Sequence, residues 1–235
     1  MGHEFSSVDE LHVDATPDQV WQAIATGPGI DSWFMGRNEV SPGETVRTAF
    51  GGYTPEHPVT AWEPGRRLAY GDDRIAYEFL VEGRDQGSTV VRVTTSGFLE
   101  GDDWADEYEA MTRGGALFIQ TLATYLDHFA GRVATPVTAF GPMITDWPHT
   151  RARLMAAIGR DGDRVHFAPA DLPVVDGVVY FENEDTIGIR TDDAIYRFLR
   201  GFRGPVMACH HLFAETDAAA TEQAWQTWLT KEDLT

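Results

Sequence analysis

Histidine offers the most direct route to chemistry in this sequence. His210 and His211 form an adjacent pair in residues 205–213, a segment with the pattern of a strand. Neighbouring side chains of a strand point to opposite faces, so we do not expect the pair to share a metal ion. His57 stands before Pro58 in a turn that enters a strand. Its imidazole either donates a hydrogen bond at the mouth of a cavity or faces solvent.

Charged side chains give weaker indications. Arg92 alternates with Val91 and Val93, and it points either inward, where it would favour an anionic ligand, or outward into solvent. Acidic residues gather at the start of a predicted helix, where they favour the helix dipole or bind a cation or partner. They are Glu100, Asp102, Asp103, Asp106, Glu107 and Glu109. Nothing in this run indicates the paired carboxylates, at a defined separation in a cleft, that acid–base catalysis uses.

Common catalytic motifs are missing from the sequence. It has no phosphate-binding loop, dinucleotide-binding glycine fingerprint, nucleophile elbow or zinc-protease helix. Its single cysteine, Cys209, excludes a thiolate zinc site and an intrachain disulfide. We therefore assign no catalytic residue, no metal and no cofactor, and we favour a binding role over an enzyme.

Aromatic residues are the strongest positive indication of a site. Residues 75–81 alternate so that Tyr77 and Phe79 share one strand face. Ligand cavities are mostly apolar with few polar groups, and Tyr70 could supply one such group beside Tyr77. Plain core packing is the competing interpretation for each residue. The candidate ligand-binding residues are Trp33, Phe50, Trp62, Tyr70, Tyr77, Phe79, Tyr108, Met111, Gly115, Phe118 and Leu122.

The elements that must position these residues begin with a strand over residues 5–13. A helix follows, with Thr16 as its N-cap and Pro17 at its first position, and a second short helix runs to about Phe34. Several strands separated by Gly, Pro and Asp turns come next. A helix with a wide apolar stripe is then predicted over residues 104–130.

The chain starts again after a linker or crossing strand at residues 132–145. A helix is predicted over 147–158, short strands between 164 and 213, and a closing helix over 218–229. The fold class is α+β, with one region at 1–131 and a smaller α+β region at 132–235. The second region is either a degenerate repeat of the first or an extension that packs on it.

Several segments together resemble a known superfamily. Trp62-Glu63-Pro64-Gly65 with Leu68 is similar to a mid-sheet strand turn, and Arg113-Gly114-Gly115 through Leu122 to a final helix, of the START-like (SRPBCC) superfamily. The bacterial family named after the activator of the heat-shock-protein-90 ATPase is the most similar group. Many of its members have Gly-Trp in place of Gly114-Gly115. The resemblance covers about residues 5–130.

The resemblance implies a helix-grip fold, in which a curved antiparallel sheet surrounds a long C-terminal helix and encloses a cavity. Gly115 would leave space where the family often carries tryptophan. The function implied first is binding of an apolar or aromatic small molecule. The alternatives are a cavity-based enzyme of the polyketide cyclase/aromatase type and a co-chaperone-like module for a protein partner; a homodimer is also compatible.

Composition narrows the partners further. The formal net charge is −19, from 18 basic and 37 acidic residues, which argues against nucleic acid and anionic membranes because these need basic patches. No apolar run approaches the roughly 18 residues of a membrane span, and no signal peptide is evident. We expect a cytoplasmic protein.

Overall fold

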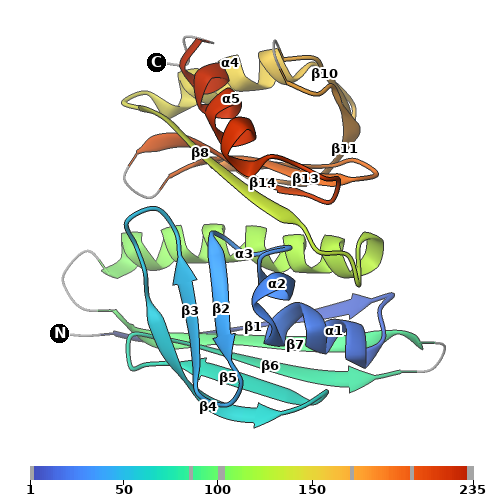
Figure 1. Ribbon diagram of the computed structural model, residues 1–235. Coiled ribbons are helices and arrows are strands. Elements are labelled where there is room, and N and C mark those ends of the chain that lie inside the picture. Colours follow the sequence, from blue (N-terminus) through green and yellow to red (C-terminus); the bar gives the residue numbers. More distant parts are fainter. Residues whose placement is uncertain (1–2, 85–86, 100–103, 170–171, 202–203, 232–235) are drawn as a thin grey trace. The chain divides into compact units, whose positions relative to one another are not determined.

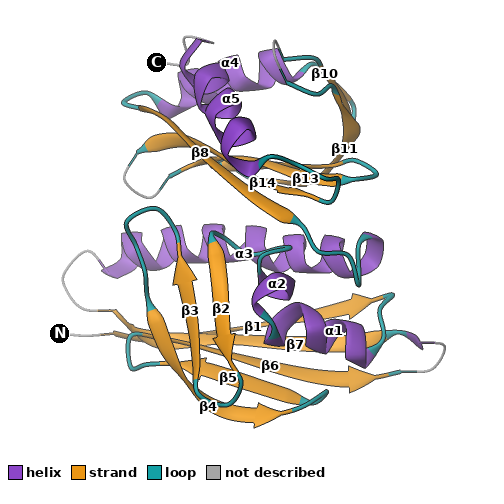
Figure 2. Ribbon diagram, in the orientation of Figure 1, coloured by secondary structure: helices purple, strands orange, loops and turns teal. Residues whose placement is uncertain are grey.

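Two compact units make up the chain, Met1–Val133 and Ala134–Thr235 (Figure 1). The structure is a computed structural model and describes residues 3–84, 87–99, 104–169, 172–201 and 204–231. Each unit combines helices with one seven-stranded antiparallel sheet (Figure 2), so the α+β class is confirmed. No helix in the described ranges is long and apolar enough to cross a membrane.

The sheet of the first unit has the strand order β1-β7-β6-β5-β4-β3-β2. Its last strand therefore lies beside its first. The sheet bends at β4, where the pairing register shifts between Val59 and Ala61, as at a β-bulge. The elements are β1 (His3–Val13), α1 (Pro17–Ala25), α2 (Gly27–Ile30), β2 (Arg37–Ser41), β3 (Thr45–Ala49), β4 (Glu56–Glu63), β5 (Arg67–Gly71), β6 (Ile75–Gly83), β7 (Thr89–Leu99) and α3 (Trp104–His128).

Helix α1 begins where its sequence predicts. The Gln19 backbone N–H donates to Thr16 Oγ1 over 3.3 Å, and the Thr16 N–H donates to Gln19 Oε1 over 2.9 Å. This reciprocal capping box satisfies backbone donors that the first helical turn leaves open. Pro17 takes the first helical position at no cost. Val20 and Ile24 are buried, so the helix packs through the predicted face.

Helix α3 lies across one face of the first sheet (Figure 1). It contacts β1 and β7, and Leu117, Leu122 and Leu126 are buried. After the helix ends, Gly131 adopts a positive φ of 83°, a conformation that suits glycine just past a helix. The first unit thus places its long helix over one face of its antiparallel sheet.

The second unit repeats the order of elements. Its sheet runs β8-β14-β13-β12-β11-β10-β9, so again the last strand pairs with the first. The segment expected to be a linker or crossing strand forms β8. The elements are β8 (Thr135–Met143), α4 (Trp147–Ile158), β9 (Arg160–Asp161), β10 (Arg164–Phe167), β11 (Val175–Glu182), β12 (Thr186–Arg190), β13 (Ala194–Arg200), β14 (Pro205–Leu212) and α5 (Ala218–Lys231).

Aromatic rings fill the core of the second unit. Trp225 of α5 lies 5.5 Å from Phe198 and 5.7 Å from Trp228, and Trp228 lies 5.1 Å from Phe167, all as ring centroids. These four side chains are at most 3% exposed. The closing helix therefore meets its sheet through large interlocking side chains.

Candidate functional site

Four hydroxyl-bearing residues line up across the first sheet. Ser7 of β1 pairs with Thr95 of β7, Thr95 with Tyr77 of β6, and Tyr77 with Tyr70 of β5. Directly opposite residues of an antiparallel pair point to the same face. Phe5, two residues before Ser7, brings its ring within 5.8 Å of Tyr108 on α3. These four residues, here called the hydroxyl row, therefore share the face that α3 covers.

A chain of aromatic rings connects this face to α3. Tyr70 lies 6.3 Å from Phe79, and Phe79 lies 6.5 Å from Trp33. Trp33 lies 5.3 Å from Phe34, which lies 4.7 Å from Phe118 on the helix. Separations of this size are typical of interacting ring pairs. The rings thus supply an apolar wall that begins beside the hydroxyl row.

Space remains on the helix side of this wall. A Cβ atom built on Gly115 would have no neighbouring heavy atom within 4 Å. On the helix, Gly115 lies between Tyr108 and Phe118 at the spacing of one face, and both rings meet residues of the sheet side. Gly115 is half-buried, so its missing side chain leaves open space on the helix beside these aromatic residues.

His57 stands at the other end of the hydroxyl row. It shares the inner face because it pairs with Val46 and lies two residues from Val59, the partner of Tyr70. Its side chain is 11% exposed, and its Nδ1 atom lies 3.5 Å from Asp72 Oδ2. Its ring centroid is 6.4 Å from that of Tyr70.

Asp72 is itself held in place by the turn between β5 and β6. Its Oδ1 atom accepts the backbone N–H groups of Arg74, over 2.9 Å, and of Ile75, over 3.1 Å. These two bonds lower the pKa of the Asp72 carboxyl, since they favour its charged form. A fixed carboxylate therefore faces the imidazole of His57.

Both tyrosines of the row keep their protons at neutral pH. Burial raises the pKa of Tyr77 to about 12, with a further contribution from Tyr53. Burial also raises the pKa of Tyr70, and the neighbouring Tyr77 adds to the effect. Desolvation disfavours a phenolate, so each residue presents a neutral hydroxyl that can donate or accept.

The structure brings five of the eleven candidate residues into contact. Trp33, Tyr70, Tyr77, Phe79 and Phe118 all belong to the hydroxyl row or to the chain of rings. Trp33 is further fixed because its Nε1 donates to the Ala23 carbonyl over 3.0 Å, and it is 4% exposed as expected.

The other candidates lie elsewhere on the unit. Trp62 meets Trp21 of α1 at 5.2 Å. The helical spacing of Val20, Trp21 and Ile24 predicts a largely buried Trp21 ring, but the structure leaves this ring half-buried. Phe50 bridges Tyr53 beyond the end of β3. The remaining four are on α3: Tyr108 against Phe5, Met111 half-buried, Gly115 with an open Cβ position, and Leu122 fully buried.

Sequence reasoning did not select Ser7, Thr95 or Phe34. The first two are short polar residues in alternating strands, and only the pairing of β1 with β7 and β6 places them beside Tyr77. Phe34 follows Trp33 in the chain, and its contact with Phe118 depends on where α3 crosses the sheet. No local signal separates such residues from ordinary core or surface positions.

The charged candidates have structural roles. Arg92 points outward and pairs with Glu10 over 2.9 Å. Glu109 pairs with Arg113 over 3.2 Å along the helix. Glu100, Asp102 and Asp103 lie outside the described residues, as do the side chains of Asp106 and Glu107. Within the described part, no cluster of three or more His, Cys, Asp or Glu residues could hold a metal.

The two adjacent histidines of β14 diverge as expected. His210 places its ring 4.4 Å from that of Trp225. His211 points the other way, with its Nε2 atom 2.6 Å from Arg197 Nη2. Burial, reinforced by the charge of Arg197, lowers the pKa of His210 to about 3. It is therefore a neutral core residue, and the pair shares no ligand.

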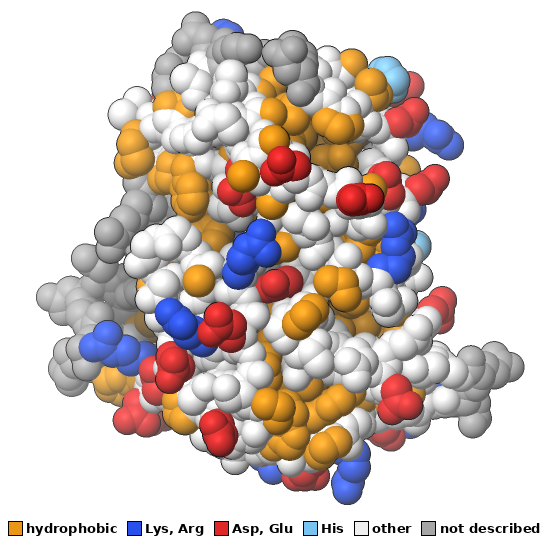
Figure 3. All heavy atoms as spheres, viewed as in Figure 1, with side chains coloured by type: hydrophobic (Ala, Val, Ile, Leu, Met, Phe, Trp, Pro, Cys, Tyr) orange, Lys and Arg blue, Asp and Glu red, His pale blue; other side chains and the backbone are white. Residues whose placement is uncertain are grey.

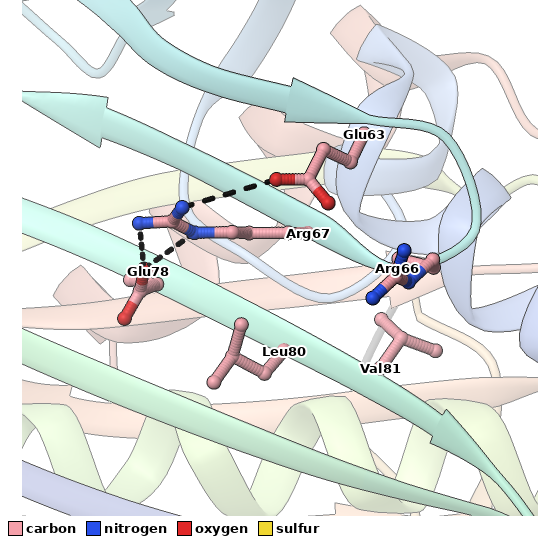
Figure 4. Close-up of a pocket in the computed structure, with 6 residues that line it drawn as sticks. All are labelled: Glu63, Arg66, Arg67, Glu78, Leu80 and Val81. Atoms are coloured by element: carbon pink, nitrogen blue, oxygen red, sulfur yellow. Dashed lines mark hydrogen bonds and ion pairs between the residues drawn. The ribbon is translucent and has the colours of Figure 1, made fainter.

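A separate, shallow pocket of about 410 Å³ lies at the turn from β4 to β5 (Figure 4). Arg67 dominates it, pairing with Glu78 over 2.6 Å and with Glu63 over 3.8 Å. The opposed charges already satisfy one another, and none of the eleven candidate residues lines this pocket. On the face shown in Figure 3, acidic side chains are scattered among basic and apolar ones.

Comparisons with known proteins add the following. No protein-family profile matches the sequence, and neither does any curated protein. Among solved structures, the Aha1 dimer from Colwellia psychrerythraea is 21% identical and matches with a TM-score of 0.44, over 52% of this chain and 96% of its own.

Two further structures match nearly the whole chain. DynU16, described as a putative protein of the dynemicin biosynthetic locus, is 18% identical with a TM-score of 0.44, over 97% of this chain and 96% of its own. The di-domain ARO/CYC BexL of the BE-7585A biosynthetic pathway is 12% identical with a TM-score of 0.43, over 96% of this chain and 93% of its own. Likeness at this level assigns no activity to this chain.

Proposed function

We propose that the first unit binds an apolar or aromatic small molecule between its sheet and α3, as a START-like helix-grip module. The observation that carries the proposal is the unfilled space at Gly115, set opposite a connected series of rings. An empty volume lined by apolar side chains costs stability, and a ligand would restore the missing contacts. Trp33, Tyr70, Tyr77, Phe79 and Phe118 are the proposed lining.

The test fills the space from the helix. Gly115→Trp places an indole where no atom lies within 4 Å of the added Cβ. Nile red, a neutral apolar dye, suits this acidic protein because charge does not repel it. We expect the parent to bind Nile red with enhanced fluorescence, and Gly115→Trp to weaken that binding at least tenfold.

Ala116→Trp is the matched control. Ala116 is the next residue of α3 and is exposed, so its indole enters solvent instead of the proposed site. Both variants should unfold cooperatively and keep the parent's circular dichroism spectrum. Equal dye binding by a folded Gly115→Trp and the parent would refute the proposal, and so would an equal loss in Ala116→Trp.

A second candidate, a cavity-based enzyme of the polyketide cyclase/aromatase type, is favoured by one observation. His57 of the inner face and the exposed Asp72 of the β5–β6 turn form an imidazole–carboxylate pair, and such a pair can transfer protons. One experiment distinguishes binding from catalysis. Protein is purified from its host, any small molecule that it carries is released, and that molecule is incubated with fresh protein. Recovery of unchanged mass favours binding. Conversion that stops in His57→Phe favours the enzyme.

A further inference from the structure

We propose that the hydroxyl row and His57 form a hydrogen-bonding subsite that selects aromatic ligands bearing a hydroxyl group over those without one. The inference rests on the proposed function, because it specifies which ligand the same space accepts. The first observation concerns the hydroxyls of the row, which lie on the face that α3 covers and have no hydrogen-bond partner among the described residues.

The side-chain hydroxyls of the row make no hydrogen bond to any residue in the described ranges. Ser7, Thr95 and Tyr77 are half-buried, and Tyr70 is 6% exposed. None of the four hydroxyl oxygens is among the fully buried, unpaired side-chain atoms of the described residues, so each stays accessible to a molecule from outside the chain. A ligand hydroxyl that replaces water there keeps these groups hydrogen-bonded, whereas an apolar ligand leaves them unsatisfied at a cost in free energy.

His57 adds an independent indication. Its Nδ1 atom is buried and has no hydrogen-bond partner among the described residues. Asp72 lies near it at 3.5 Å, and a carboxylate at that nitrogen favours the tautomer with its proton on Nδ1. The Nε2 atom of that tautomer carries a lone pair. It can then accept a hydrogen bond from a ligand hydroxyl.

The geometry points to a flat ligand that has both an apolar body and oxygen substituents. Strands of a sheet lie about 4.8 Å apart, so the row across β1, β7, β6 and β5 spans on the order of 14 Å. The rings of Tyr70 and Phe79 lie beside it and favour stacking. An aromatic hydroxyl compound meets both demands, while a plain hydrocarbon leaves the row unsatisfied.

Two probes that differ in one group test this selectivity. 2-Naphthol and 2-methoxynaphthalene share a ring system, and only the first can donate an O–H to His57 or to the row. We expect the parent to bind 2-naphthol about five- to tenfold more tightly, as one neutral hydrogen bond predicts. Fluorescence titration gives both dissociation constants.

Substitutions in the proposed subsite test which residues cause the preference for 2-naphthol. Ser7→Ala combined with Thr95→Val removes two inner hydroxyls, and His57→Phe removes the ring nitrogens. Each should reduce the ratio of the two affinities toward one and leave 2-methoxynaphthalene binding within about twofold. The controls are Ser6→Ala with Ser96→Ala, a cross-strand pair of the same strands on the opposite face, and His12→Phe, an exposed histidine of β1. Both controls should keep the parent's ratio.

The outcomes separate the inference from the proposed function. Equal affinities in the parent, or a preference that survives both inner variants, would overturn the inference and leave the proposed function standing. So would failure of both naphthalene probes in a protein that binds Nile red at Gly115. Failure of Nile red itself would remove the proposed function, and this inference with it.

Discussion

The two units have the same strand order but differ in how the closing helix meets the sheet. In the second unit, α5 inserts Trp225 and Trp228, which meet Phe167, Phe198 and each other. In the first, α3 presents Gly115 with open space at its Cβ position. With the same strand order, the two closing helices therefore turn different side chains toward their sheets, two interlocking indoles in the second unit and a glycine in the first.

Polar groups separate the two units less sharply than the aromatic rings do. In the second unit, the inner-face histidine, His210, lies among Trp225, Tyr196 and Phe198. Its Nδ1 accepts the Arg197 backbone N–H over 3.2 Å, while its buried Nε2 has no partner among the described residues. In the first unit, the hydroxyls of the row have no hydrogen-bond partner in the described part. The aromatic packing therefore distinguishes the second unit, and we propose the first as the one that binds.

The largest effect should follow from hollowing the packed unit. Trp225→Ala removes a fully buried indole and should lower the free energy of unfolding by about 3–5 kcal/mol. Urea unfolding of the full chain measures this. If the folded variant also binds Nile red, the comparison between the units becomes sharper. A single residue of the closing helix would then decide whether the second unit has space for a ligand. A loss below about 1 kcal/mol would contradict the packed core.

Removing a ring from the first unit should cost less. Trp33→Ala deletes a 4% exposed indole and its bond to Ala23, and we expect about 3 kcal/mol. The half-buried Trp21 is the control, with about 1 kcal/mol expected for Trp21→Ala. The same urea titration compares them. Equal losses of stability would show that the two rings are buried to the same extent. That result would contradict the arrangement of α1 and α2 described above.

These expectations show where local sequence suffices. Three features can be recognised within one helical turn or one strand: the N-cap at Thr16, the alternation of residues 75–81 and the apolar stripe that includes Gly115. Each lies in an element that the structure confirms. The hydroxyl row could not be read in this way. Ser7 and Thr95 are neighbours only because the chain's seventh strand returns beside the first, and pairing over that distance leaves no local pattern.

Trp62 shows a second limit of local sequence. Its ring meets Trp21 of α1. The register shift in β4 between Val59 and Ala61 places Trp62 opposite Leu68, on the same face as Val59, and nothing in the residue types indicates a bulge at this point. Composition therefore selects aromatic residues but does not say which neighbours they meet.

A pH effect should arise from the buried histidine of the second unit. Burial lowers the pKa of His210 to about 3, whereas an unfolded histidine has a pKa near about 6.5. The unfolded chain therefore takes up a proton first as pH falls, and stability is lost between these values by at most about 1.4 kcal/mol per pH unit. Urea unfolding at pH 7.5, 6 and 5 measures the slope.

His210→Gln removes this titration and should flatten the slope, even if stability at pH 7.5 is lower. His166→Gln is the control, since His166 is an exposed histidine of the same unit. A slope that is unchanged in His210→Gln would show that the buried imidazole does not govern the acid response.

The smallest effect should come from the ion pairs of Glu182. Burial would raise the pKa of this carboxyl, but hydrogen bonds and charges from Arg160 and Arg151 outweigh it and lower the pKa. The resulting stability is present above the ordinary pKa of glutamate and is lost as pH falls below it. Glu182→Gln should cost about 1 kcal/mol or less at pH 7, and thermal melts should show a smaller difference at pH 3.

The position of each last strand also constrains how the protein is made. β1 pairs only with β7, from His3 with Leu99 to Val13 with Thr89, so the first sheet cannot close until nearly all of its unit has left the ribosome. At about 5–20 residues per second, β1 waits on the order of 4–20 s for its partner. Its alternating exposed residues include Glu4, Glu10 and His12, and charge on a lone strand hinders pairing with other chains. Each half of the protein is thus committed to folding as a whole, after synthesis of its last strand.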